Sequence, residues 1–414
     1  MNRKILAVAA LYIPLAANAL GVDWSAFGTA GYARSDQPYR YQRWIDGNGT
    51  LMRDSVIVGQ VDVRFNQAWG AAIQGRIAPS DHHDSAVESA VSWAFVSWRP
   101  MDDILVRLGK LRLPLMLNTE NQDVGVTYDF ARLPIEVYSI IPTSEFTGVS
   151  ATKSWQLPDV ELSAEIYSGR AVNYTRYYGR EVRDDSISSG AWFERLTVRS
   201  TGVVFTAKGM DNVFRAGLHE AVVSRPGGII SDIPYREIVP GVGYYDVSNG
   251  PPADRIRIPV QSLGASVMLP GRINLMSEYA RMKVNSASSG MGRWGAYIAL
   301  SKHLGAWTPY VSYAKTRSEN SALEKYRAIN GNVSPLFSSQ LNNYQKLNAD
   351  IVSPYDQWTG AIGASYRLTT RSLLKAEWAH TRTGIVSSFV DAPSGGNSAD
   401  QRINVFSLSY SFSF

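Results

Sequence analysis

Charged side chains of both signs are concentrated in one short part of the chain. Three basic residues are followed by three carboxylates and a further arginine: Arg107, Lys110, Arg112, Glu120, Asp123, Asp129 and Arg132. Basic and acidic groups that face each other across a narrow opening create a transverse field, which orients polar solutes and sets ion preference. The chemistry expected here is electrostatic selection of solutes, without bond making.

Catalysis is not expected, because the residues that it needs are not grouped. No G-x-S-x-G nucleophile motif accompanies the five scattered histidines, His82, His83, His219, His303 and His380. The stretch DHHD (81–84) carries metal-capable side chains, but adjacent histidines tend not to converge on one ion. The chain has no cysteine, so thiol metal sites and disulfides are excluded. We predict no enzyme, no metal and no cofactor.

The elements that must position these charges show a period of two. The C-terminal stretch INVFSLSYSFSF alternates apolar or aromatic residues with serines from Phe406 to Phe414, which is the pattern of a strand. The same alternation recurs along the chain, for example at Ile57–Phe65, Ile104–Leu108 and Leu263–Leu269, with polar residues on the opposite parity. Each predicted strand therefore has one apolar face and one polar face.

The connections between these strands alternate in length. Seven short ones lie between eight longer polar ones, at about 34–53, 79–89, 111–145, 169–190, 224–256, 284–291, 318–356 and 384–400. This arrangement predicts an all-β fold, a sixteen-stranded antiparallel transmembrane β-barrel with short periplasmic turns and long extracellular loops. A closed barrel is the only sheet that can cross lipid, because closure leaves no unpaired edge. The last strand should pair with the first, near residues 24–33.

The N-terminal stretch MNRKILAVAALYIPLAANA has the layout of a secretory signal peptide, with cleavage expected after Ala19. Its apolar part is shorter than a bilayer needs, which argues against a membrane anchor. Loss of Arg3 and Lys4 leaves 39 basic against 36 acidic residues, a net charge of +3 that is too small to indicate nucleic acid. We therefore expect an exported domain spanning residues 20–414.

The third long connection, 111–145, is too apolar for a solvated loop, so we expect it to fold inward as a constriction loop and present its carboxylates to the pore. An outward cap or a subunit contact is the alternative. Lumenal parity predicts a wall of basic residues, Arg64, Arg76, Arg107, Arg195, Arg215, Arg367 and Lys375, against acidic ones, Asp62, Glu161, Glu165, Glu278 and Glu377. Seven against five indicates at most a weak anion preference.

A C-terminal strand with Tyr410, Phe412 and a terminal Phe414 resembles the assembly signal of Gram-negative outer-membrane porins. The stretch VSWAFVSWRPMDDILVRLGKLRLPLMLNTENQDVGVTYDFARLPIEVYS is similar to the strand, turn, strand and third loop of porins with a vRxGR strand end. The resemblance implies a passive diffusion pore for small hydrophilic solutes in the outer membrane. It also implies a homotrimer in contact with lipid and lipopolysaccharide, inserted by the outer-membrane assembly machinery. The acidic, Gly-rich motif that enteric porins carry in the third loop is absent.

Two other functions remain open from the sequence. A substrate-specific channel would have the same barrel with a binding site in its lumen. A surface adhesion or structural barrel would act through its long loops. The stretch YTRYYGR (174–180) alternates aromatic and basic residues, which suits sugar stacking or lipopolysaccharide phosphates, although a strand extending beyond the membrane is the favoured interpretation.

Overall fold

The computed structural model describes residues 21–140, 144–182, 190–284, 290–393 and 396–414. The predicted signal peptide, residues 1–19, lies outside the described residues. Within them the chain forms one closed antiparallel barrel of sixteen strands, which confirms the predicted fold class. The barrel strands are β1 (Gly21–Ser35), β2 (Val56–Arg64), β3 (Trp69–Pro79), β4 (Val87–Met101), β5 (Ile104–Arg112), β6 (Glu145–Gln156), β7 (Glu161–Gly179), β8 (Gly190–Lys208), β9 (Val213–Ser224), β14 (Ile256–Leu269), β15 (Ile273–Met282), β16 (Arg293–Lys302), β17 (Trp307–Ser318), β18 (Tyr355–Thr369), β19 (Ser372–Ser387) and β20 (Arg402–Ser413).

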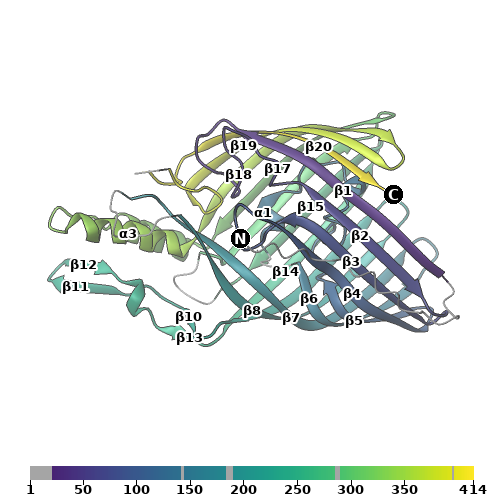
Figure 1. Ribbon diagram of the computed structural model, residues 1–414, viewed down its shortest axis with the longest axis horizontal. Coiled ribbons are helices and arrows are strands. Elements are labelled where there is room, and N and C mark those ends of the chain that lie inside the picture. Colours follow the sequence, from purple (N-terminus) through teal and green to yellow (C-terminus); the bar gives the residue numbers. More distant parts are fainter. Residues whose placement is uncertain (1–20, 141–143, 183–189, 285–289, 394–395) are drawn as a thin grey trace, which may run out of the picture.

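The barrel closes between its first and last strands. β1 pairs with β2 on one side, in register Trp24 with Val61, and with β20 on the other, in register Ala30 with Tyr410. Figure 1 shows the purple β1 beside the yellow β20 along this seam. The predicted pairing of the first and last strands is therefore confirmed. This closure pairs the backbone groups that would otherwise form an open edge.

The two faces of the wall differ as the alternation predicts. Apolar side chains point outward and are exposed on the isolated barrel, among them Ile73, Ile166, Leu218, Leu263 and Ile362. In β20 the serines 407, 409 and 411 lie buried on the inner side, while Phe406, Leu408 and Tyr410 lie outside. An apolar exterior over a polar interior is the arrangement that a lipid bilayer requires of a barrel.

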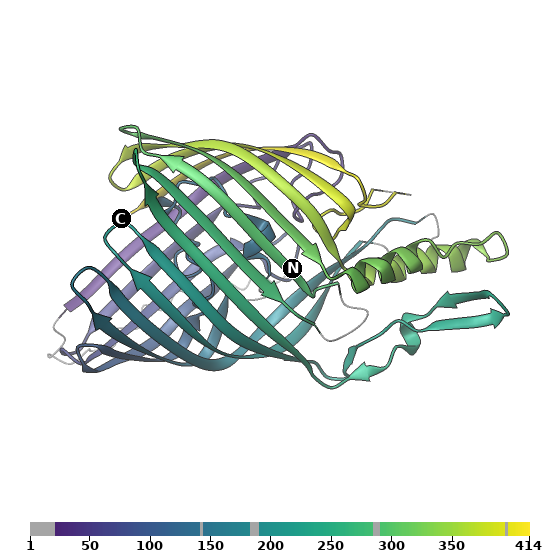
Figure 2. The same ribbon diagram turned by 180° about the vertical axis from the view of Figure 1, so that it is seen from behind.

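The short and long connections lie at opposite ends of the barrel. Two elements of the long connections project beyond the rim in Figures 1 and 2, a helical hairpin and a β-hairpin. The helices are α1 (Ile135–Tyr138), α2 (Asn320–Asn330), α3 (Ser339–Val352) and the 3₁₀ turns η1 (Gly125–Thr127) and η2 (Val247–Asn249); the small strands are β10 (Ile229–Ile230), β11 (Tyr235–Val239), β12 (Val242–Tyr245) and β13 (Pro252–Ala253). In the described part of the chain, no helix has the length and apolar character to cross a membrane.

One connection is shorter than predicted. The range 169–190 was expected to be a loop, but β7 and β8 continue as a paired ladder to Gly179 and Gly190. The stretch 174–180 is therefore mostly strand, which agrees with the favoured interpretation of its alternating residues.

Candidate functional site

The connection between β5 and β6 is here termed the third connection, and its described residues, 113–140 and 144, lie inside the barrel as predicted. Its apolar side chains are buried against inward-facing wall residues, in one cluster that joins Leu113, Leu115, Met116, Phe130, Val137 and Ile140 to Tyr167, Val198, Val260, Tyr297 and Tyr310. The Phe130 ring packs edge-on against Tyr310, with 5.1 Å between the ring centroids. Removing this apolar surface from water stabilises the inward position.

The middle of the third connection crosses to the seam between β1 and β20. A Cβ atom on Gly125 would lie 2.3 Å from the Ser411 Oγ and 2.5 Å from the Thr29 Oγ1, so only glycine fits there. Lys375 of β19 donates from Nζ to the carbonyl oxygens of Gly125 (2.6 Å) and Phe130 (3.0 Å). Lys375 therefore holds the connection against the wall instead of facing open lumen.

Two further contacts tie the third connection to the far side of the barrel. Arg132 donates from Nε to the Asp54 Oδ1 at 2.9 Å and also pairs with Oδ2 through Nη2. Ser365 of β18 donates to Asp129 at 2.6 Å. Asp129 and Arg132, which the sequence assigned to the constriction, are thus engaged with the barrel. Burial alone would raise the pKa of Asp54, but the Arg132 and Arg53 guanidiniums hold it below its ordinary value.

Glu136 of α1 was expected among the carboxylates that face the pore, and this expectation is wrong. The side chain is buried and accepts hydrogen bonds from Gln357 Nε2 (2.7 Å) and from Thr359 Oγ1, at 2.5 Å. Two donors on β18 of the wall therefore satisfy this carboxylate.

The predicted wall arginines do meet the carboxylates of the third connection. Arg107 Nη1 lies 3.9 Å from Glu120 Oε1, and Arg215 Nη2 lies 3.8 Å from Glu120 Oε2. Arg76 Nη1 lies 3.9 Å from Asp123 Oδ2. These separations are longer than hydrogen bonds, so the two signs face each other without closing on direct contacts. We term these five residues the constriction cluster.

Arg107, Lys110 and Arg112 have three different environments. Arg107 also donates to Glu165 of β7 at 2.8 Å. Lys110 Nζ lies 2.7 Å from the Glu145 Oε2. The Arg112 side chain is 1% exposed, pairs with Asp123 and donates to the Thr119 carbonyl oxygen at 3.2 Å. Arg112 therefore holds the base of the third connection and is not available to passing solutes.

The remaining predicted wall residues divide by position. Asp62 accepts a hydrogen bond from Gln60 Nε2 at 2.7 Å. Arg64 and Arg367 are exposed at the ends of β2 and β18 that adjoin short turns. The assignment of Arg195 to the lumen is wrong, because this residue shares the outward parity of β8 with the exposed Phe205. Leu196 and Val198 hold the inward parity there.

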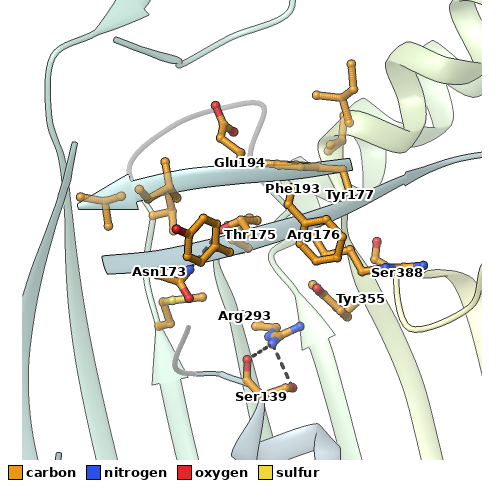
Figure 3. A pocket seen from close by; sticks show the side chains of 18 of the residues that line it. Ser139, Asn173, Thr175, Arg176, Tyr177, Phe193, Glu194, Arg293, Tyr355 and Ser388 are labelled. Atoms are coloured by element: carbon orange, nitrogen blue, oxygen red, sulfur yellow. Dashed lines mark hydrogen bonds between the residues drawn. The ribbon is translucent and has the colours of Figure 1, made fainter. Parts of the chain in front are cut away.

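Between the third connection and the other long connections lies a cavity of about 760 Å³, here termed the vestibule (Figure 3). Its lining is largely aliphatic and aromatic, and it includes Trp44, Ile135, Ile140, Phe193, Leu196, Val198, Val223, Ile256, Ile258, Met282, Tyr355 and Phe389. Five arginines also reach it, Arg43, Arg53, Arg176, Arg225 and Arg293. The vestibule could not be predicted from the sequence, because its lining comes from thirteen separate stretches of the chain.

The DHHD stretch contacts residues that line the vestibule. Asp84 accepts hydrogen bonds from Arg43 Nε (2.8 Å) and Arg176 Nη2 (2.9 Å), while His82 stacks on Tyr174 with 4.6 Å between ring centroids. Burial would raise the pKa of Asp84, but Arg176 and Arg43 keep it below the usual value. These side chains turn to different partners, and the described residues form no group of three potential metal ligands.

Comparison with known proteins gives a clear result for structure alone. No family model matches the sequence, and no curated protein matches it. The fold is similar to the anion-selective porin of Comamonas acidovorans, with a TM-score of 0.52, 12% identity, and coverage of 95% of this chain and 99% of that one. For the outer membrane channel DcaP of Acinetobacter baumannii the TM-score is 0.51 and the identity 12%, with coverage of 95% of this chain and 98% of that one. For OprB of Pseudomonas putida the TM-score is 0.52 and the identity 8%, with coverage of 95% of this chain and 94% of that one.

These neighbours share the closed barrel, at identities that establish fold only. The resemblance noted in the sequence is thereby confirmed: the chain has the fold of Gram-negative outer-membrane porins, a fold whose place is the cell outer membrane.

Proposed function

We propose that this protein is an outer-membrane channel through which small hydrophilic solutes and ions diffuse passively. The observation that carries the proposal is the constriction cluster, in which Arg76, Arg107 and Arg215 of the wall face Glu120 and Asp123 of an inward-folded connection at 3.8 to 3.9 Å. Groups of both signs at a narrowing orient polar solutes and disfavour apolar ones. No step of this transport needs an enzyme or a cofactor.

The ion preference that we propose is weakly anionic. Without Arg195, the predicted lumen wall keeps six basic residues against five acidic ones. Lys375 and Glu278 are both taken up by contacts with the third connection, which leaves five against four. The similarity in fold to an anion-selective porin supports the same sign. Most of the wall charges have partners, so the preference should be small.

A homotrimer in contact with lipid and lipopolysaccharide completes the proposal, as the porin resemblance implies. Single-channel conductance in a planar bilayer, with a salt gradient across it, tests the whole assignment. Discrete, salt-dependent steps in multiples of three are expected. The absence of any conductance from a barrel that is shown to be folded would contradict a channel function.

A second candidate function is adhesion through the extracellular loops. The α2–α3 and β11–β12 hairpins project beyond the rim, and Leu336 (79% exposed) and Ile238 (56% exposed) present apolar surface there. Loops held by a rigid scaffold are where binding residues are concentrated. Retained conductance after deletion of both hairpins, together with lost binding to a host or neighbouring cell surface, would separate adhesion from transport.

A further inference from the structure

The lining of the vestibule does not match a path for hydrophilic solutes alone. Most of the side chains that reach it are apolar, with Ile135, Phe193, Leu196, Ile258 and Met282 among them. A cavity of about 760 Å³ has the size of sites that enclose small organic ligands. Such sites combine an apolar lining with a few polar groups that fix the orientation of the ligand. The polar groups of the vestibule therefore indicate which ligand would fit.

Four of the five arginines that line the vestibule are paired with carboxylates. The pairs are Arg43 with Asp84 (2.8 Å), Arg53 with Asp54 (3.5 Å), Arg176 with Asp391 (2.7 Å), and Arg225 with Glu194. Arg293, at the start of β16, has no carboxylate within ion-pair distance among the described residues. The Glu136 carboxylate attracts the Arg293 guanidinium from beyond ion-pair distance, and it already accepts hydrogen bonds from Gln357 and Thr359.

The hydrogen bonds of Arg293 are also incomplete. Its Nη2 donates to Ser139, to the carbonyl oxygen at 2.5 Å and to Oγ at 3.1 Å. Nε and Nη1 are buried and make no contact with the distance and angle of a hydrogen bond in the described part of the chain, although the Tyr355 hydroxyl is close enough to interact with the guanidinium. A buried guanidinium with unsatisfied donors is costly, and an anionic acceptor would remove much of that cost. Figure 3 shows Arg293 between Ser139 and Tyr355.

Aromatic rings cover this guanidinium. The Arg293 Cζ atom lies 3.6 Å from the centroid of the Tyr355 ring and 5.5 Å from that of Phe389, which are cation–π distances. Both rings line the vestibule. Nε and Nη1 have almost no accessible surface, so an anion can reach them only if a side chain that covers them moves.

We propose that the vestibule binds organic monoanions with a ring-sized apolar body, which lies against the aliphatic lining while its carboxylate pairs with Arg293. This inference rests on the proposed channel function and names a substrate class for it. An uncharged ring would leave the guanidinium unsatisfied, and a small carboxylate would leave the apolar lining in water. Both halves of the ligand are needed for recognition.

Calorimetric titration of the purified, folded protein provides the test, with benzoate as the probe. Benzyl alcohol keeps the ring without the charge, and acetate keeps the charge without the ring. We expect benzoate to bind roughly tenfold or more tightly than either comparator, since each lacks one of the two interactions.

The decisive variant is Arg293→Gln, which should weaken benzoate binding by roughly tenfold while leaving benzyl alcohol unchanged. Arg293→Lys keeps the charge and should restore part of the affinity. Arg281→Gln is the matched control, because Arg281 is half exposed on the neighbouring strand β15, opposite in parity to Met282 of the vestibule. Heat-modified gel migration verifies that each variant is folded.

Conductance in KCl, measured on the same preparations, separates this inference from the channel function. A conducting protein that binds benzoate no better than acetate, or equally well with Gln at position 293, would overturn the inference and leave the channel intact. Benzoate binding that depends on Arg293 in a non-conducting barrel would support the site and refute diffusion. Dependence on Arg293 in a conducting barrel supports both.

Discussion

Asp54 and Arg132 form a two-pronged ion pair between the first and third long connections, which are 78 residues apart in sequence at this contact. Both side chains are largely buried, at 12% and 9% exposed. Arg53 Nη1 adds a second cation 3.5 Å from the same carboxylate. The extracellular end of the barrel thus fixes the connection that narrows the lumen.

Replacing Asp54 with Asn should loosen the third connection. The change leaves Arg132 buried without its counter-charge, and losing one partner of such a pair costs roughly 3–5 kcal/mol. We expect frequent closures and excess noise in single-channel recordings. Asp103→Asn is the control, because this carboxylate pairs with Lys153 at the short-turn end and its side chain is 45% exposed. Quiet currents from Asp54→Asn would show that the pair does not hold the connection.

Acidification should release the same contact. Because Arg132 holds the pKa of Asp54 below its ordinary value, the stabilisation is present at and above about pH 4, near the pKa of about 3.9 in the unfolded chain, and is lost as pH falls further. Recordings stepped from pH 7 to pH 3 should remain steady until below pH 4 and then become noisy. The Asn variant should lack this acid transition; a transition of equal size in both proteins would point to other groups.

Ion preference should depend on Arg107 and Lys110. Replacing both with Gln is expected to shift the reversal potential toward the value of a cation-selective channel and to change the anion-to-cation permeability ratio several-fold. The reason is that two unit charges about 4 Å apart interact with about 1 kcal/mol even in water. Arg170→Gln is the control, because Arg170 is exposed on the outward parity of β7 with Ile166. An unchanged potential in the double variant would remove these two residues from the account of selectivity.

The terminal strand should be required for assembly. Phe414 is 68% exposed on the outer face, its backbone N–H donates to the Ala26 carbonyl at 2.7 Å, and its ring packs near Phe412. Phe414→Asp puts a charge on the lipid-facing side and should lower the yield of heat-modifiable barrel several-fold. Phe414→Tyr should assemble normally. Full yield from the Asp variant would contradict an assembly role for Tyr410, Phe412 and Phe414.

The barrel could be predicted from the sequence, because the alternation of apolar and polar residues along a strand is a local property. The parity of Phe406 and Ser407 already tells which side of the wall each occupies, and the lengths of the connections order the strands. The inward third connection was also predictable, since residues such as Leu113 and Ile140 needed a surface to pack against.

Contacts between segments that are distant in the chain could not be predicted from the sequence. Arg195 is an exception of another kind, because its outward parity follows from the length of β8, which runs unbroken to Phe205 and beyond. Arg112 belongs to the predicted basic cluster, but its burial depends on Asp123 folding back onto it. The helices α2 and α3 lie in what was expected to be a plain loop, and Arg293 stands out only through the partners that it lacks.

The position of Gly125 has a consequence for the order in which the molecule is made. This glycine touches Thr29 of the first strand and Ser411 of the last, whose hydroxyls are themselves 2.9 Å apart. Its binding surface therefore does not exist until the two ends of the chain have met. A chain interrupted before its final strand would lack part of the surface that Gly125 contacts, so an incompletely built barrel could not hold the third connection as the finished one does.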